Sequence, residues 1–147
     1  LKVSIAPQMP NLYPDGHTVG GGFNELAPLI AMENVTVLES VQAQMYNSWE
    51  QVETVSYAET YTKELNDGYN VTGDGQTFFV QVPHTQLVLG YPSSHRAAGT
   101  GYIDPTKLKS MYQTLKSQGL TIQGFMTWSI GWDQQNDWDF ANTLGNL

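Results

Sequence analysis

The sequence from residue 124 to residue 133 reads Gly124-Phe125-Met126-Thr127-Trp128-Ser129-Ile130-Gly131-Trp132-Asp133. It begins as an apolar run typical of a buried strand and ends in two tryptophans and a carboxylate. A barrel strand presents polar and aromatic side chains at its carboxyl end in this way, which is where such folds carry their sites. Taken alone, core packing explains the tryptophans at least as well, because a buried tryptophan packs more often than it binds.

The length and composition of the chain suit one globular unit, residues 1–147, because 40% of its residues are hydrophobic and no stretch is a convincing interdomain linker. Fourteen acidic against six basic residues give a net charge of −8, which disfavours nucleic acid as a partner because it repels a phosphate backbone. No run is long enough to span a membrane. There is no cysteine, and His17, His84 and His95 lack a ligand spacing, so we predict no metal site and no cofactor.

Further strands and helices are predicted from periodicity and from turn residues. The strands are expected at residues 3–8, 41–46, 86–92 and 122–130, and residues 78–83 have no firm assignment. The helices are expected at residues 23–32, 51–65, 105–118 and 140–144. For the third helix, Asp104 fits the N-cap, Pro105 fits the first helical position and Gly119 ends the helix. The glycine-rich and asparagine-rich stretches 11–22 and 67–76 are expected to be loops.

Strand and helix thus alternate four times, which predicts an α/β fold with a parallel sheet. Polar and aromatic residues follow the strand ends, where parallel strands bring them together: Gln8 and Asn11, Tyr46 and Asn47, Tyr91 and Ser93, Trp128 and Asp133. Four such units make half of a closed eight-stranded barrel.

Together, the four strand ends resemble glycoside hydrolase family 18, the chitinase family. The matching segments are SIAPQ at residues 4–8, QMYN at 44–47, LVLGYP at 87–92 and MTWSIGWD at 126–133, with a small-residue segment AGTGY at 98–102. They come in the order of the family's strands five to eight and cover nearly the whole chain. The resemblance implies half of a TIM-type (β/α)8 barrel, made of the four parallel βα units of strands five to eight.

The family's proton donor is a glutamic acid in a D-x-x-D-x-D-x-E pattern after its fourth strand, and this sequence contains no such pattern. Asp133, Asp137 and Asp139 have a different spacing and place. The resemblance therefore implies that residues 1–147 are a C-terminal portion that lacks the catalytic acid and is inactive alone. It further implies a secreted, extracellular protein that hydrolyses β-1,4-linked N-acetylglucosamine polymers with retention, by attack of the substrate's own acetamido oxygen.

The resemblance also implies roles for individual residues. Tyr46 would donate its hydroxyl to the acetamido carbonyl oxygen, and Gln44 would help to position the acetamide or the catalytic carboxylates. Trp128 would be the apolar floor of the sugar subsite where cleavage occurs. Weaker candidates for the lining of the substrate site are Gln8, Asn47 and Trp132.

Each candidate has a simpler explanation. Tyr46 and Gln44 could be satisfied polar groups of the barrel interior. Asp133 could be a loop cap, and Arg96 is most simply a solvated charge. Three other tryptophans, Trp49, Trp132 and Trp138, could equally pack or bind.

Four units alone would expose two sheet edges and an apolar inner face. We therefore expect this chain to meet the missing N-terminal half-barrel or a second copy of itself, and to bind chitin or a chito-oligosaccharide. Two alternatives stay open: an endo-β-N-acetylglucosaminidase, which shares the subsite, and a non-catalytic, chitin-binding lectin related to chitinases. An intact upstream D-x-x-D-x-D-x-E pattern would support hydrolysis, whereas loss of its glutamic acid would support binding only.

Overall fold

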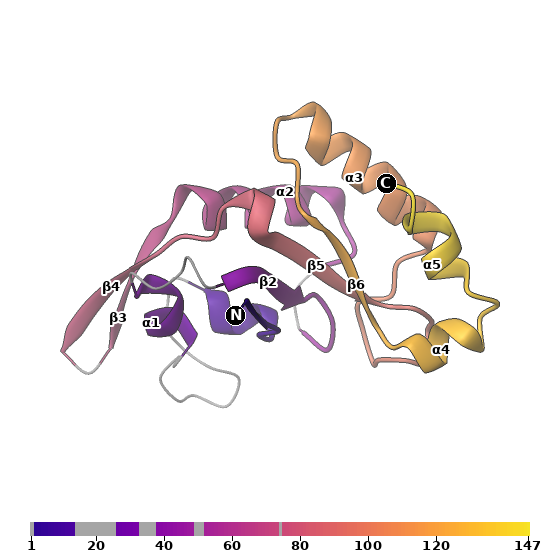
Figure 1. Ribbon diagram of the computed structural model, residues 1–147, viewed down its shortest axis with the longest axis horizontal. Helices are drawn as coiled ribbons and strands as arrows, with labels where there is room; N and C mark the ends of the chain where they lie inside the picture. Colours follow the sequence, from indigo (N-terminus) through magenta and orange to yellow (C-terminus); the bar gives the residue numbers. More distant parts are fainter. Residues whose placement is uncertain (1, 14–25, 33–37, 49–51, 74) are drawn as a thin grey trace.

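The computed structural model describes residues 2–13, 26–32, 38–48, 52–73 and 75–147 (Figure 1). Its centre is a four-stranded sheet in which every neighbouring pair is parallel. The strands lie in the order β1 (Val3–Ile5), β2 (Leu38–Gln44), β5 (Leu87–Pro92) and β6 (Gly124–Trp128). Each strand therefore pairs with the next parallel strand along the chain, and the predicted α/β architecture is confirmed.

The helices follow the strands as the alternation predicts. They are α1 (Leu26–Ala31), α2 (Val55–Asp67), α3 (Pro105–Ser117), α4 (Ile130–Gln134) and α5 (Asp139–Leu144), with 3-10 turns η1 (Met9–Leu12) and η3 (His84–Gln86). Asp104 caps α3 by accepting from the Thr106 N–H at 2.9 Å, as predicted. Thr54 caps α2 by accepting from the Tyr57 N–H at 3.2 Å, so this helix begins later than residue 51. Within the described ranges, no helix is long and apolar enough to cross a membrane.

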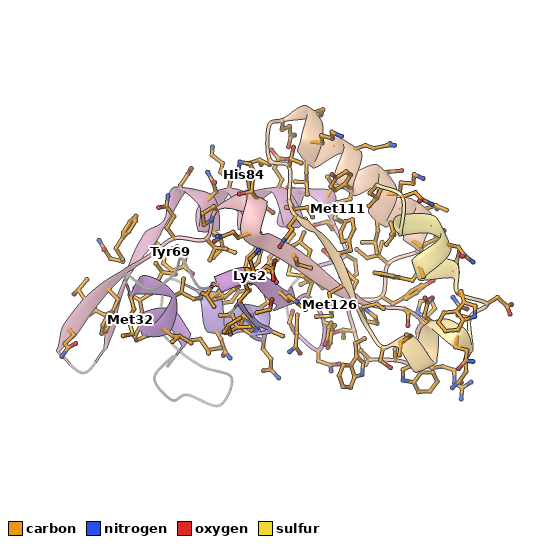
Figure 2. All side chains as sticks on the ribbon, in the orientation of Figure 1. Lys2, Met32, Tyr69, His84, Met111 and Met126 are labelled. Atoms are coloured by element: carbon orange, nitrogen blue, oxygen red, sulfur yellow. The ribbon has the colours of Figure 1, made fainter. Side chains whose placement is uncertain are left out.

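The two faces of the sheet have different partners because side chains alternate along a strand. On one face, residues of β2 and β5 enter the buried core beneath the helices: Val41, Ala43, Leu87, Leu89 and Tyr91. The Tyr91 hydroxyl reaches Met111 of α3 on this side, whereas Met126 of β6 lies against Gly90 on the other (Figure 2). We call this second side, away from the helical core, the inner face.

The inner face is more polar than expected. The Ser40 hydroxyl donates to the Ser4 hydroxyl at 2.9 Å, and the Gln42 amide donates to the Ser40 hydroxyl at 3.3 Å. Val88 and Met126 are the apolar contribution from β5 and β6. The prediction of an apolar inner face was wrong for β1 and β2, because their alternate positions carry serine and glutamine.

A β-hairpin interrupts the alternation between α2 and β5. Strands β3 (Tyr69–Gly73) and β4 (Gln76–Val80) pair antiparallel, so part of the expected loop at residues 67–76 is a strand, and the unassigned residues 78–80 belong to its partner. The Tyr69 hydroxyl donates to the Leu12 carbonyl oxygen, which ties the hairpin to η1. The hairpin lies beside α1 and reaches away from the carboxyl ends of β5 and β6 (Figure 1).

The chain after β6 turns at once into α4, so the strand predicted to residue 130 ends at Trp128. Asp133 of α4 is 2% exposed. Its carboxylate oxygens accept from the Phe140 N–H at 2.9 Å and from the Ala141 N–H at 3.1 Å. Asp133 therefore caps the first turn of α5, which is the structural explanation that the sequence left open.

Replacing Asp133 with Ala should destabilise the protein by about 1–3 kcal/mol, because the substitution removes two charge-assisted hydrogen bonds and leaves the Phe140 N–H buried without its acceptor. Urea denaturation of the two proteins measures the difference. The neighbouring change Gln134→Ala, at an exposed position of the same helix, is the control and should be nearly neutral. Equal effects of the two changes would contradict the capping role.

Candidate functional site

The predicted site residues meet at the carboxyl end of the sheet. Gln8 forms a parallel bridge with Gln44, and Trp128 pairs with Pro92 at the end of β5. Gln44 and Tyr46 are two residues apart, so their side chains leave β2 and its extension on the same side. That side is the inner face, as the burial of Val41, Ala43 and Met45 in the helical core requires.

Gln44 is half-buried, and a backbone partner holds its amide. The side-chain Nε2 donates to the Ala6 carbonyl oxygen at 2.6 Å, and the Gln44 N–H donates to the Pro7 carbonyl oxygen at 2.9 Å. The amide plane is therefore oriented by the segment that follows β1. The other side-chain atom, Oε1, is an acceptor that can face a bound ligand.

Tyr46 is buried, with 8% of its surface exposed. Burial raises the pKa of its phenol above the usual value, because the charged form would lose its hydration. Among the described residues, the Tyr46 hydroxyl has no hydrogen-bond partner. A phenol that stays neutral and lacks an internal acceptor is suited to donate a hydrogen bond to a ligand.

Trp128 ends β6 with 53% of its surface exposed. Its carbonyl oxygen accepts from the Ser93 N–H at 3.2 Å, and the Ser93 hydroxyl donates to the Ser129 carbonyl oxygen at 3.2 Å. The Asn136 side chain donates to the Ser93 carbonyl oxygen at 3.4 Å. The Trp128–Ser129 peptide bond is cis. The buried Ser93 thus joins the end of β5 to the tryptophan-bearing segment, a role that its place after a strand did not reveal.

Asn47 has a left-handed backbone, with φ of 53°. Its side-chain oxygen accepts from the Gly99 N–H at 2.9 Å. This bond fastens the chain after β5 to the chain after β2. The proposed contact of Asn47 with substrate stays a prediction, and the amide nitrogen is the group left to make it.

Trp132 of α4 has a cationic neighbour that the sequence did not predict. Arg96 is exposed, as expected, but its guanidinium carbon lies 5.0 Å from the centroid of the Trp132 ring. Trp138 immediately precedes α5 and is 40% exposed. Trp49 lies outside the described residues. The part of the chain that the structure describes brings no three histidine, cysteine, aspartate or glutamate side chains together in a group that could hold a metal ion.

The chain is similar to chitinases over most of its length. It is 27% identical to a chitinase of Enterococcus faecalis over 99% of this chain and 44% of that protein. It is 30% identical to chitinase D of Niallia circulans over 84% of this chain and 28% of that protein. The chain thus spans less than half the length of these relatives. No protein-family model matches it.

Solved structures show the fold. A glycoside hydrolase family 18 chitinase from Chromobacterium violaceum superposes with a TM-score of 0.77, at 22% identity, over 97% of this chain and 44% of that one. A xylanase and alpha-amylase inhibitor protein from Scadoxus multiflorus superposes with a TM-score of 0.63, at 24% identity, over 95% of this chain and 42% of that one. With its parallel sheet, the chain has a fold of the TIM-barrel type.

Alkaline titration tests the environment of Tyr46. Comparison of the wild-type protein with Tyr46→Phe should show that the lost phenol titrates above the usual pKa of 10.0. Because the pKa of the Tyr46 phenol is raised in the folded state, its ionisation does not affect the free energy of unfolding below the unfolded-state pKa. The free energy of unfolding then falls as pH rises from that value through the folded-state pKa. Ultraviolet difference spectra of the two proteins measure this step. If the titration step that disappears in Tyr46→Phe has a pKa at or below 10.0, the hydroxyl is solvated.

Proposed function

We propose that this chain, a chitinase-like domain of glycoside hydrolase family 18, forms the substrate-positioning half of a site that hydrolyses β-1,4-linked N-acetylglucosamine polymers. The observation that carries the proposal is Tyr46, a buried residue two positions from Gln44 on the inner face, whose hydroxyl has no acceptor among the described residues. Chitinase relatives that align with most of the chain support the substrate class.

In the proposed reaction, the acetamido oxygen of the substrate attacks the anomeric carbon. The glycosidic bond to that carbon breaks, and a glutamic acid gives its proton to the leaving oxygen. Water then opens the cyclic intermediate from the other side and returns a proton to the glutamate, so the configuration is retained. The acetamido oxygen must be held in line with the anomeric carbon, so the groups that orient the acetamide decide the rate.

Tyr46 and Gln44 suit opposite ends of the acetamide. The Tyr46 hydroxyl donates to the acetamido carbonyl oxygen. Because the Gln44 Nε2 is already engaged by the Ala6 carbonyl oxygen, its Oε1 is the atom that accepts from the acetamido N–H. The half-exposed Trp128 ring offers an apolar floor to a sugar ring, and Gln8, Asn47 and Trp132 extend the lining.

The proton donor, in this proposal, comes from outside residues 1–147. It belongs to an N-terminal half-barrel that continues the sheet and faces the inner side, and a second copy of this chain is the other candidate partner. The polar inner face supports such a partner, since serine and glutamine side chains from β1 and β2 can pair with polar groups opposite them. We place the complete protein outside the cell, where chitin is met.

A non-catalytic role is the second candidate. The structural similarity to a xylanase and alpha-amylase inhibitor protein favours it, because that protein shares the fold and is an inhibitor by name. In this case the same Tyr46, Gln44 and Trp128 would bind a chito-oligosaccharide without turnover. An endo-β-N-acetylglucosaminidase would use the same subsite, and comparing hydrolysis of chito-oligosaccharides and N-glycans separates it from a chitinase.

Residues 1–147 alone should not release fluorophore from a fluorogenic chitobioside, because no residue here matches the family's proton donor. The full-length protein, assayed at the same concentration, is the positive control. If purified residues 1–147 hydrolyse the substrate and keep this activity after a second purification, the proton donor does not come from another segment.

In the full-length protein, Tyr46→Phe should lower kcat by well over tenfold, since it removes the donor that orients the attacking acetamido group and a misplacement of about 1 Å can lower a rate about 100-fold. Tyr112→Phe, which removes a hydroxyl from α3 in the helical layer, is the matched control and should leave kcat within about twofold of wild type. An unchanged rate for Tyr46→Phe would remove this residue from the mechanism.

A further inference from the structure

The loop between β5 and α3, residues 93–104, crosses the end of β2 and contacts the backbone of Tyr46. Gly101 of this loop is buried and has φ of 92°. A Cβ atom at Gly101 would lie 2.5 Å from the Met45 carbonyl oxygen and 2.7 Å from the Tyr46 Cα atom. Real Cβ atoms essentially never come within 3.0 Å of such atoms, so this approach requires glycine.

Hydrogen bonds to residues beyond β2 hold the loop in this place. The Glu53 carboxylate accepts from the Gly101 N–H at 3.0 Å, and the Asn47 side-chain oxygen accepts from the Gly99 N–H at 2.9 Å. The Thr100 hydroxyl donates to the Ser48 carbonyl oxygen at 3.3 Å. These bonds join residues 99–101 to residues that follow Tyr46, next to the close contact between Gly101 and Tyr46, so the loop and the end of β2 form one unit.

We propose that Gly101 and Glu53 are positioning residues for Tyr46: together they press the β5–α3 loop against the Tyr46 backbone and so set the place of its hydroxyl. This inference rests on the proposed function of Tyr46. The hydroxyl stands at the far end of the ring, so a small rotation of the backbone at Cα moves the oxygen through a larger distance. A displacement of about 1 Å at a reacting group can lower a rate about 100-fold.

Glu53 can be changed without opening the core. It is exposed, and it borders two adjoining cavities of about 350 and 270 Å³ that His95 and Tyr102 also line. Water can therefore fill the space that a shorter side chain leaves. The main loss in Glu53→Ala is the acceptor for the Gly101 N–H, whereas Glu53→Gln keeps an oxygen at that place.

The first test compares two glycines of the same loop in the full-length protein. Gly101→Ala should lower kcat for chitobioside hydrolysis by about 10- to 100-fold with a smaller change in KM. Gly99→Ala is the matched control, because the one contact that a Cβ there makes with described residues is to the Asn47 side-chain oxygen, at 3.4 Å. It should leave kcat within about twofold of wild type. Equal kcat values for the two variants would overturn the role of Gly101.

The second test is independent of Gly101, whose alanine variant can fail to fold. Glu53→Ala should lower kcat by about threefold to tenfold, and Glu53→Gln should restore at least half of the wild-type rate. A loss of the same size in both variants, or in neither, would overturn the role of Glu53.

A double-mutant cycle with Tyr46→Phe separates positioning from general destabilisation. If the loop acts through the Tyr46 hydroxyl, Glu53→Ala and Gly101→Ala should lower kcat by about twofold or less in the Tyr46→Phe background. Full effects in both backgrounds would overturn positioning and leave the proposed function standing. An unchanged rate for Tyr46→Phe itself would overturn both. If the protein binds chito-oligosaccharide without hydrolysis, the hydrolase proposal fails and the same cycle, measured on Kd, decides positioning.

Discussion

Successive side chains of a strand must point to opposite faces, and this constraint divides every parallel strand of the sheet between two tasks. Leu87, Leu89 and Tyr91 of β5 fill the helical core, which leaves Val88 and Gly90 to the inner face. The same alternation turns Gln44 and Tyr46 away from the core. The candidate site therefore depends on the register of the core, because a shift by one residue would exchange the two sets.

Much of this arrangement could be predicted from sequence because its signals are local. Asp104-Pro105 marked the start of α3, and the apolar run at residues 87–92 marked a strand buried on both faces. Gln44, Tyr46 and Trp128 were placed by a family resemblance carried by short segments at the strand ends, and these residues do lie at one end of the sheet. Their chemical roles stay proposals.

The errors have physical causes. Glycine and asparagine near residues 67–76 indicated a loop, although Asp74-Gly75 between β-branched and aromatic residues is also a hairpin signal. Ile130 extended the predicted strand because it is apolar, yet it is 74% exposed on α4. Ser93 and Arg96 meet partners more than thirty residues away, on the segment after β6. No periodicity reveals such contacts between loops, since each depends on the finished fold.

The β3–β4 hairpin has a consequence for engineering. It enters the chain between α2 and β5, and its far end, where Gly73 pairs with Gln76, points away from the ends of β5 and β6 that carry the candidate site (Figure 1). A turn in this position can accept additional chain with little effect on the sheet, because the ladder from Tyr69 to Val80 closes the insertion at its base. An affinity tag, a fluorophore or a surface-immobilisation handle can therefore be installed there while the end of the sheet that carries the candidate site stays open.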